Sequence, residues 1–299
     1  MNDQDHSRER RAAALVLFGA VCISFAPVFV KLLAPGSVGP TAIGFWRTLF
    51  GSAVLFIWCG AQGRSLLVAK AAIKFALLAG FFFFLDLAFY HRSILFCGAG
   101  MATILSNTQV FATSIFAWLI YKERLTLKFV IAAIAAVFGV VLLSGVLSAE
   151  VQLTPTYVSG IGFGLGTGLM YAGFLLTLRR GGKLETPPDP VAFMAWTSLA
   201  TAVFSGIEAP FEVYAFMPPN LESYLILLAL GLVAQAVGWR TISAALPRLA
   251  TARASLILLL QPTLATVWGL WFFHETLVLT QFLGAAITLA AIYVGSLRK

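Results

Sequence analysis

Ten apolar runs of about 20 residues each divide the sequence, and this pattern limits the fold more than any other feature. A run of this length crosses the hydrocarbon core of a bilayer as an α-helix. A transmembrane β-barrel would instead show shorter segments of alternating hydropathy. We therefore expect an all-α integral membrane protein with ten transmembrane helices. The predicted spans are 12–33, 40–60, 73–95, 98–120, 127–147, 156–178, 189–207, 222–245, 250–273 and 277–297.

The composition excludes several other classes of protein. Hydrophobic residues make up 60% of the chain and charged residues only 11%, against about 45–50% and 25% in soluble domains. A soluble enzyme, a disordered protein and a secreted disulfide scaffold are therefore excluded. The three cysteines and three histidines have no metal-ligand spacing. We expect no metal site, no cofactor and no enzymatic activity, because neither a nucleophile–base arrangement nor a Walker motif is visible.

The basic residues predict the orientation of the chain. If the N-terminus is cytoplasmic, alternate loops and the two termini hold fifteen Lys and Arg, and the opposite loops hold only Lys31 and Arg92. The positive-inside rule then places both termini in the cytoplasm, with residues 1–11 as a tail. We expect a multi-pass membrane protein that retains its first helix. The net charge of +8 is interpreted as this topology signal, and nucleic acid is not an expected partner.

The chain also contains an internal repeat. At an offset of 152 residues, the segment 109–125 matches the segment 261–277, and Gln, Glu and Leu coincide. Upstream, an offset of 149 pairs Asp86 with Gln235 and Tyr90 with Trp239. We expect two five-helix repeats, 12–147 and 156–297. Five is an odd number of spans, so the second repeat is inverted, as in many secondary transporters.

Three motifs carry a resemblance to a known family. They are A-I-G-F-W-R-T-L-F at 42–50, A-W-L-I-Y-K-E-R-L-T-L at 117–127, and L-L-L-Q-P-T-L-A-T-V-W-G-L-W-F-F-H-E-T-L at 258–277. Over nearly its whole length the chain resembles the EamA-type members of the drug/metabolite transporter superfamily. It departs from them at Val110, where many members have a proline, while Pro262 is kept.

This resemblance implies a secondary transporter that works by alternating access around a cavity lined by helices 1, 3, 4, 6, 8 and 9. The expected partners are membrane lipids and a small metabolite for export. An aromatic or other neutral amino acid is favoured by similarity to bacterial amino-acid exporters. The alternatives within the superfamily are a drug, a nucleoside or another metabolite. An alternative of another class is a non-transport membrane protein, either a lipid-acting enzyme or a structural subunit. The oligomeric state is left open.

Two charged residues at membrane depth are the sharpest candidates for a substrate site. A carboxylate at the centre of a bilayer costs at least ~2.5–3.5 kcal/mol, so Asp86 should face the bundle interior. It could bind a substrate ammonium group, relay a proton, or hold a helix through an ion pair. Tyr90 follows four residues later on the same helix face. Arg47 could bind a carboxylate in the cavity, snorkel to the interface, or pair with another helix.

Further candidates are aromatic or polar residues within the spans. Trp239 and Tyr171 would present aromatic faces to an apolar side chain or a cation. Asn107 and Gln261 would either contact the substrate or hydrogen-bond between helices. The sequence Gly160-x-x-x-Gly164-x-x-x-Gly168 predicts close packing of the sixth helix against its neighbours.

Overall fold

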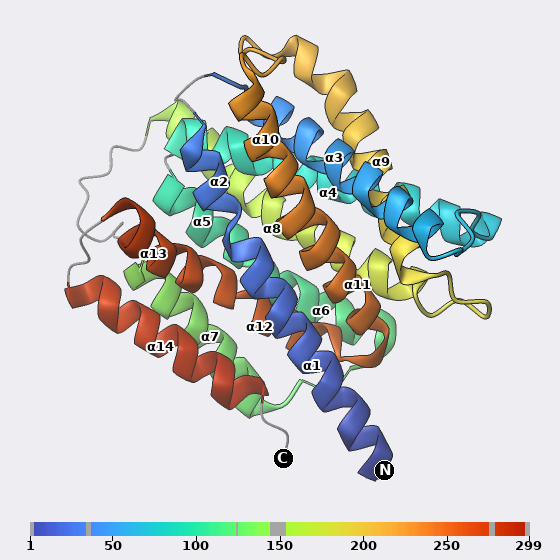
Figure 1. Ribbon diagram of the computed structural model, residues 1–299. Helices are drawn as coiled ribbons and strands as arrows, with labels where there is room; N and C mark the ends of the chain where they lie inside the picture. The colour runs from blue at the N-terminus through green and yellow to red at the C-terminus, as the bar shows by residue number, and fades with distance from the viewer. Residues whose placement is uncertain are drawn as a thin grey trace.

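The structure, a computed structural model, describes residues 3–33, 37–97, 99–123, 125–143, 154–274 and 279–296, and these fold entirely into helices and connections (Figure 1). The helices of the first half are α1 (Asp3–Ser24), α2 (Ala26–Leu32), α3 (Pro40–Ala61), α4 (Lys70–Cys97), α5 (Ala99–Asn107), α6 (Gln109–Tyr121) and α7 (Leu127–Leu143). Those of the second half are α8 (Pro155–Gly181), α9 (Pro190–Glu208), η2 (Ala209–Phe211), α10 (Leu221–Leu230), η3 (Gly231–Trp239), α11 (Arg240–Ala245), η4 (Leu246–Arg248), α12 (Thr251–Leu258), α13 (Leu260–Phe273) and α14 (Leu279–Ser296).

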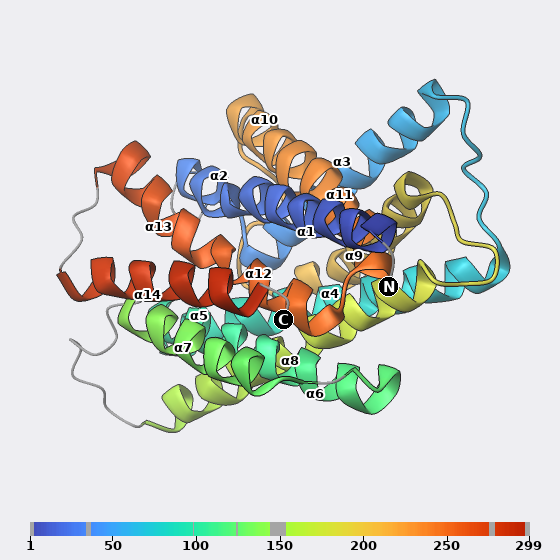
Figure 2. The same ribbon diagram turned by 90° about the horizontal axis from the view of Figure 1, so that it is seen from below.

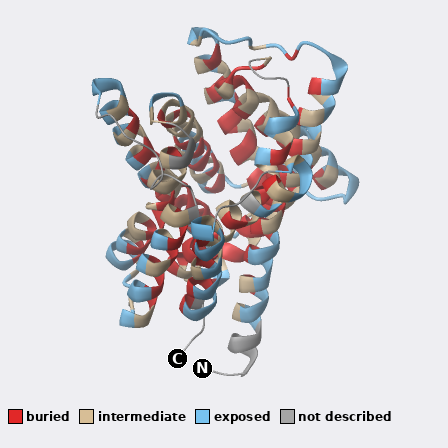
Figure 3. Ribbon diagram, turned by 90° about the vertical axis from the view of Figure 1, so that its left-hand side faces the viewer, coloured by how far each residue is buried: buried red, intermediate tan, exposed pale blue. Residues whose placement is uncertain are grey.

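The helices confirm the predicted membrane fold. Eight helical stretches among the described residues are long and apolar enough to cross a membrane, and the shorter apolar helices Leu127–Leu142 and Leu279–Gly295 complete the predicted ten. Their outward faces carry large apolar side chains, such as Ile57, Trp271 and Phe282, which are 72%, 73% and 64% exposed. Buried residues lie on the facing sides of the helices (Figure 3). An apolar outer surface of this kind belongs in lipid, because in water it would drive aggregation.

Prolines and a capping aspartate mark where several helices begin. Pro40, Pro155 and Pro190 are the first residues of α3, α8 and α9, where the missing N–H has no intrahelical partner to lose. The Asp189 carboxylate accepts hydrogen bonds from the backbone N–H groups of Val191 (2.8 Å) and Ala192 (3.2 Å). Such caps satisfy donors at helix starts, which lie near the membrane surface.

Four of the spans are interrupted. Span 1 breaks at Phe25, two residues before Pro27, and span 9 breaks at Leu259, three residues before Pro262. Span 4 breaks at Thr108 without a proline, and the Thr108 hydroxyl donates to the Leu105 carbonyl instead. Span 8 contains a π-helix, η3, between α10 and α11. Breaks and π-turns within spans leave backbone groups free for function where they face the protein interior.

The two halves exchange equivalent contacts, which is the sign of two-fold symmetry. The third span (α4) packs along the sixth span (α8). The repeat counterparts of these two are the eighth span (η3 and α11) and the first span (α1), and they also pack against each other. The helices α7 and α14 pack on each other along one edge (Figures 1 and 2). Because each half contributes five spans, equivalent helices run in opposite directions, and the repeats are inverted as predicted.

Two glycines show this symmetry at atomic detail. A Cβ on Gly80 would meet the Thr197 carbonyl oxygen and the Thr201 backbone nitrogen of α9 at 2.8 and 3.0 Å. A Cβ on Gly231 would meet the Arg47 carbonyl oxygen and the Gly51 backbone nitrogen of α3, both at 2.9 Å. Each contacted residue of α9 lies 150 positions after its counterpart in α3. The helices therefore approach closely enough at both places that only glycine fits.

The glycine pair also corrects the upstream register of the repeat. Gly80 and Gly231 are 151 residues apart, so at this contact the two halves are related by an offset of 151 and not 149. The π-helix begins at Gly231 and changes the number of residues per turn from there, so a constant offset fails beyond it. The downstream offset of 152 holds. Lys122 and His274 end α6 and α13 in the same left-handed conformation, with φ values of 54° and 52°.

The predicted glycine stripe of the sixth span packs closely, as expected. Added Cβ atoms at Gly160, Gly164 and Gly168 would lie 2.6–2.8 Å from α4, α5 or Thr108, which joins α5 to α6. At Gly164 the nearest atoms are Leu105 Cβ at 2.6 Å and Ser93 Oγ at 2.8 Å. Gly162 lies on the exposed side of the same helix, with no atom within 4 Å of its added Cβ.

These two glycines give a matched test of the packing. Gly164→Ala should lower the free energy of unfolding by about 1–3 kcal/mol, the usual cost of overpacking. Gly162→Ala should leave stability unchanged or slightly higher, because alanine is the better helix former. Thermal unfolding of both variants in the same detergent measures the difference. Equal stability of the two variants would contradict the close approach of α8 to α4 and α5.

Candidate functional site

Arg47 of α3 and Asp86 of α4 are the charged centre of the bundle. Asp86 is 6% exposed and Arg47 is partly buried. Each is the other's foremost charged neighbour, but among the described residues they form no direct ion pair. The Arg47 Nε atom is buried without a hydrogen-bond acceptor. Two opposite charges are thus held near each other without neutralising each other by contact.

A cluster of four aromatic rings lies beside these charges. We call it the aromatic cluster, and it consists of Phe83, Tyr171, Phe174 and Trp239. Phe83 stacks on Phe174 with centroids 4.5 Å apart, and Trp239 meets the Phe174 ring edge-on at 4.7 Å. The Arg47 guanidinium lies 5.7 Å from the centre of the Phe83 ring. The cluster joins α4 and η3, the counterpart spans of the two halves, through α8.

Two hydrogen bonds extend this site toward the broken spans. The Gln261 side-chain amide of α13 donates to the Tyr171 hydroxyl at 3.5 Å. On the other side of Asp86, the Tyr90 hydroxyl and the Thr103 hydroxyl of α5 lie 3.2 Å apart. The Asn107 side-chain amide donates to the Thr103 carbonyl at 2.7 Å, within α5. The Asn107 side chain therefore forms its hydrogen bond within its own helix, next to the break at Thr108.

The structure thus brings the sequence-predicted residues into two linked groups. The first contains Arg47, Tyr171, Trp239 and Gln261, and the second contains Tyr90 and Asn107. Asp86 lies between them on α4, which carries Phe83 of the aromatic cluster on one side of it and Tyr90 on the other.

Sequence reasoning missed two aromatic members of the site and two further buried polar residues of the bundle. Phe83 and Phe174 carry no distinguishing signal among 26 phenylalanines. Gln235 is fully buried, and its amide donates to the Ser198 hydroxyl at 2.9 Å, while its Oε1 atom has no partner. The His91 Nδ1 atom is also buried without a partner. A polar residue in an apolar span was the available signal for both.

The arrangement offers complementary chemistry to one kind of ligand. It has an anion, a cation, unused hydrogen-bond groups and aromatic faces at membrane depth. Among the described residues, no three His, Cys, Asp or Glu side chains gather closely enough to hold a metal ion.

Trp239 allows the packing of the cluster to be tested separately from its hydrogen bonding. Its Nε1 atom is buried and has no acceptor. Trp239→Phe keeps a ring and breaks no hydrogen bond, so we expect it to lower stability by less than about 1.5 kcal/mol. Phe174→Ala leaves a cavity and should cost about 3–5 kcal/mol. Thermal unfolding in detergent compares them, and an equal loss in the two variants would contradict this expectation.

Comparison with known proteins gives consistent relatives. The chain is 26% identical over 292 residues to an uncharacterized transporter of Archaeoglobus fulgidus, covering 95% of this chain and 96% of that protein. It is 25% identical over 243 residues to a probable amino-acid metabolite efflux pump of Escherichia coli, covering 76% and 78% of the two chains. A protein of known crystal structure, 17% identical, matches 96% of each chain with a TM-score of 0.82. That last likeness shows the fold.

A family model describes almost the whole chain. It matches twice, over residues 10–145 and again over 158–297, which agrees with the two inverted halves of the fold. With ten apolar helical segments, two copies of one repeat and relatives named as transporters, the chain belongs to the EamA-like transporter family.

Proposed function

We propose that this transporter exports neutral amino acids, aromatic ones in particular, across the bacterial inner membrane by alternating access. The observation that carries the proposal is the charged centre. The Arg47 guanidinium lies 5.7 Å from the ring of Phe83, which is buried about one helical turn from Asp86 on α4, and Arg47 and Asp86 form no ion pair among the described residues. A zwitterion has one group of each sign and can satisfy both. A ligand with a single charge would leave one of them without a partner, which is costly at membrane depth.

Each residue of the site has a role in this proposal. Asp86 accepts from the substrate ammonium group, and Arg47 donates to its carboxylate. Tyr171 and Trp239 of the aromatic cluster contact the apolar side chain. Tyr90, Asn107 and Gln261 supply polar contacts around the site. The name of the Escherichia coli relative, a probable amino-acid metabolite efflux pump, supports this class of substrate.

The proposed orientation follows from the charges at the two ends of the bundle. One end of the bundle is called here the basic end. It holds the turn after α6, the loops 182–189 and 246–250, and the start of α1. The last turn of α14 lies at this same end (Figures 1 and 3). The positive-inside rule assigns the basic end to the cytoplasm. The halves 12–147 and 156–297 then rock about the central site to expose it to either side.

Transport by purified protein in liposomes tests the proposal. We expect flux of labelled phenylalanine or other neutral amino acids through the wild-type protein. Asp86→Asn and Arg47→Gln should each reduce the apparent affinity by about 10- to 100-fold, because a hydrogen bond to a charged group contributes about 1.5–3 kcal/mol. Arg47→Gln should also reduce the preference for the amino acid over the corresponding amine, which lacks the carboxylate.

Matched controls make this result specific. Glu222→Gln applies the same chemical change as Asp86→Asn to an exposed residue in the first turn of α10, and it should transport normally. Flux with and without a pH gradient separates facilitated export from proton coupling. Normal amino-acid transport by folded Asp86→Asn and Arg47→Gln protein would refute the assigned site. Flux of a nucleoside or cationic drug, without amino-acid flux, would replace the proposed substrate by those classes.

A further inference from the structure

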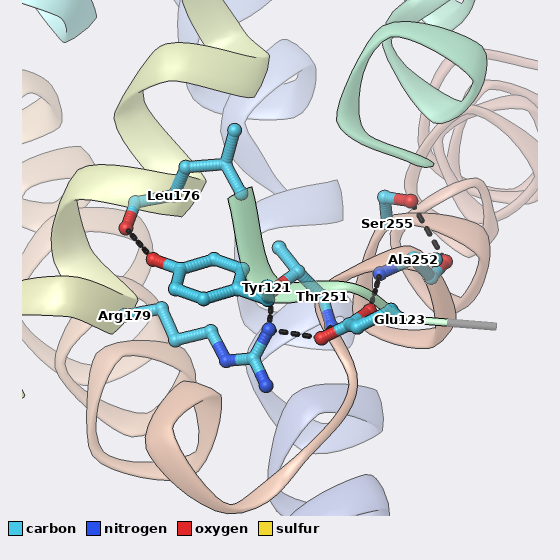
Figure 4. A network of polar contacts seen from close by, with 7 residues as sticks. All are labelled: Tyr121, Glu123, Leu176, Arg179, Thr251, Ala252 and Ser255. Atoms are coloured by element: carbon cyan, nitrogen blue, oxygen red, sulfur yellow. Dashed lines mark hydrogen bonds and ion pairs between the residues drawn. The ribbon is translucent and has the colours of Figure 1, made fainter. Parts of the chain in front are cut away.

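A second polar assembly lies at the basic end, outside the proposed substrate site (Figure 4). Glu123, in the turn after α6, is ion-paired with Arg179 in the last turn of α8. The same carboxylate accepts from the backbone N–H groups of Thr251 (3.3 Å) and Ala252 (3.5 Å), at the start of α12. One side chain therefore joins three spans, one from the first half and two from the second.

Arg179 and Tyr121 complete this assembly. The Arg179 guanidinium donates to the Thr251 hydroxyl at 2.5 Å and lies 4.4 Å from the centre of the Tyr121 ring. The Tyr121 hydroxyl donates to the Leu176 carbonyl of α8 at 3.1 Å. We call the set formed by Tyr121, Glu123, Arg179 and Thr251 the polar lock.

The polar lock differs from an ordinary surface ion pair in its burial. The side chains of Arg179 and Glu123 are 9% and 13% exposed, whereas those of Arg64 and Asp189 at the same end are 40% and 28% exposed. A buried carboxylate is stabilised both by its ion pair and by the N-terminus of a helix. Removing either partner leaves the other buried and uncompensated, so the three spans are held together strongly.

The polar lock lies between the basic end and the proposed central site. One turn further along α12 from Thr251, the Ser255 carbonyl accepts a hydrogen bond at 3.2 Å from the side chain of Gln109, at the start of α6, and both residues are buried. The same span continues through the break at Leu259 to Gln261 of the proposed site. Movement of α6 away from α8 and α12 must therefore break the polar lock first. Arg253 of α12 and Glu9 of α1 add an ion pair to the first span.

The inverted repeat supports a gating role. Phe273 is 152 residues after Tyr121 and ends α13 as Tyr121 ends α6. The Lys31 ammonium, in the last turn of α2, lies 4.6 Å from the centre of the Phe273 ring. This mirrors Arg179 over Tyr121 at the opposite end. At the basic end, a cation over an aromatic ring joins spans 4 and 6. At the opposite end, the same kind of contact joins their repeat counterparts, spans 9 and 1. Glu275, the repeat counterpart of Glu123, lies outside the described residues.

We propose that the polar lock is the gate of the basic end, and that the Glu123–Arg179 pair must separate each time the central site opens there. In this role the residues contact no substrate and act by controlling access. The proposal concerns the motion of a transporter and holds whichever solute is carried.

Site-directed labelling tests the gate without any substrate. Ser255→Cys is introduced after Cys22, Cys59 and Cys97 are replaced by alanine, because Ser255 is fully buried just beyond the polar lock. A membrane-impermeant maleimide is added to vesicles of either orientation. We expect slow labelling in the otherwise unchanged protein. Glu123→Gln should raise the rate from the basic end by about tenfold, since loss of one buried charge favours the separated form.

Two further variants make the result decisive. Arg64→Gln breaks the exposed ion pair at the same end and should leave the labelling rate unchanged. Arg179→Lys keeps the charge but weakens the contacts with Glu123 and Thr251, so it should raise the rate by a smaller factor and serves if Glu123→Gln does not fold. If folded Glu123→Gln and Arg179→Lys label no faster than Arg64→Gln, the polar lock is a static staple and the proposal is wrong. Because no solute enters this assay, its outcome is independent of the proposed amino-acid substrate.

Discussion

The close approach of helix backbones at Gly80 and Gly231 is the constraint on which the rest of the fold depends. Lipid offers no hydrophobic drive for helices to associate, so they are held by van der Waals contact and by hydrogen bonds between them. Contact at 2.8–3.0 Å from an added Cβ is available only to glycine, and Gly80 and Gly231 make such contacts with backbone atoms of the facing helix, one in each half. These two contacts fix α4 on α9 and η3 on α3. They thereby set the depth at which Asp86, Arg47 and Trp239 lie in the bundle.

Charged side chains at the centre of the bundle differ from those at its ends in whether they form ion pairs. At the centre, Arg47 and Asp86 remain without a direct ion pair, whereas toward the ends the described residues form four ion pairs. Arg92 pairs with Glu208 at the end opposite the basic end, and Arg179 pairs with Glu123 at the basic end. Paired charges near the membrane surfaces stabilise a closed form. In the proposed function, the charges left available at the centre bind the solute.

The sequence predicts the fold well because its information is carried by long runs of residues. Ten apolar runs, an asymmetric charge distribution and a repeated Q…E-x-L pattern are each spread over many positions. The site is only partly predictable, since Asp86, Arg47 and Trp239 stand out by type or depth, but nothing marks Phe83 and Phe174 among so many phenylalanines. The polar lock was missed for another reason. Glu123 and Arg179 look like ordinary loop charges, and only the fold shows that both are buried against the start of α12.

The π-helix at Gly231–Trp239 has a consequence for how a solute is carried. It shifts the residues of η3 relative to their counterparts in α4, so the two central helices no longer present the same chemistry. α4 provides the carboxylate of Asp86 and the hydroxyl of Tyr90, while η3 provides the indole of Trp239. A fully symmetric carrier would hold its cargo equally well in two opposite poses. The proposed carrier, whose charged groups Arg47 and Asp86 both come from the first half, favours a single pose of its substrate.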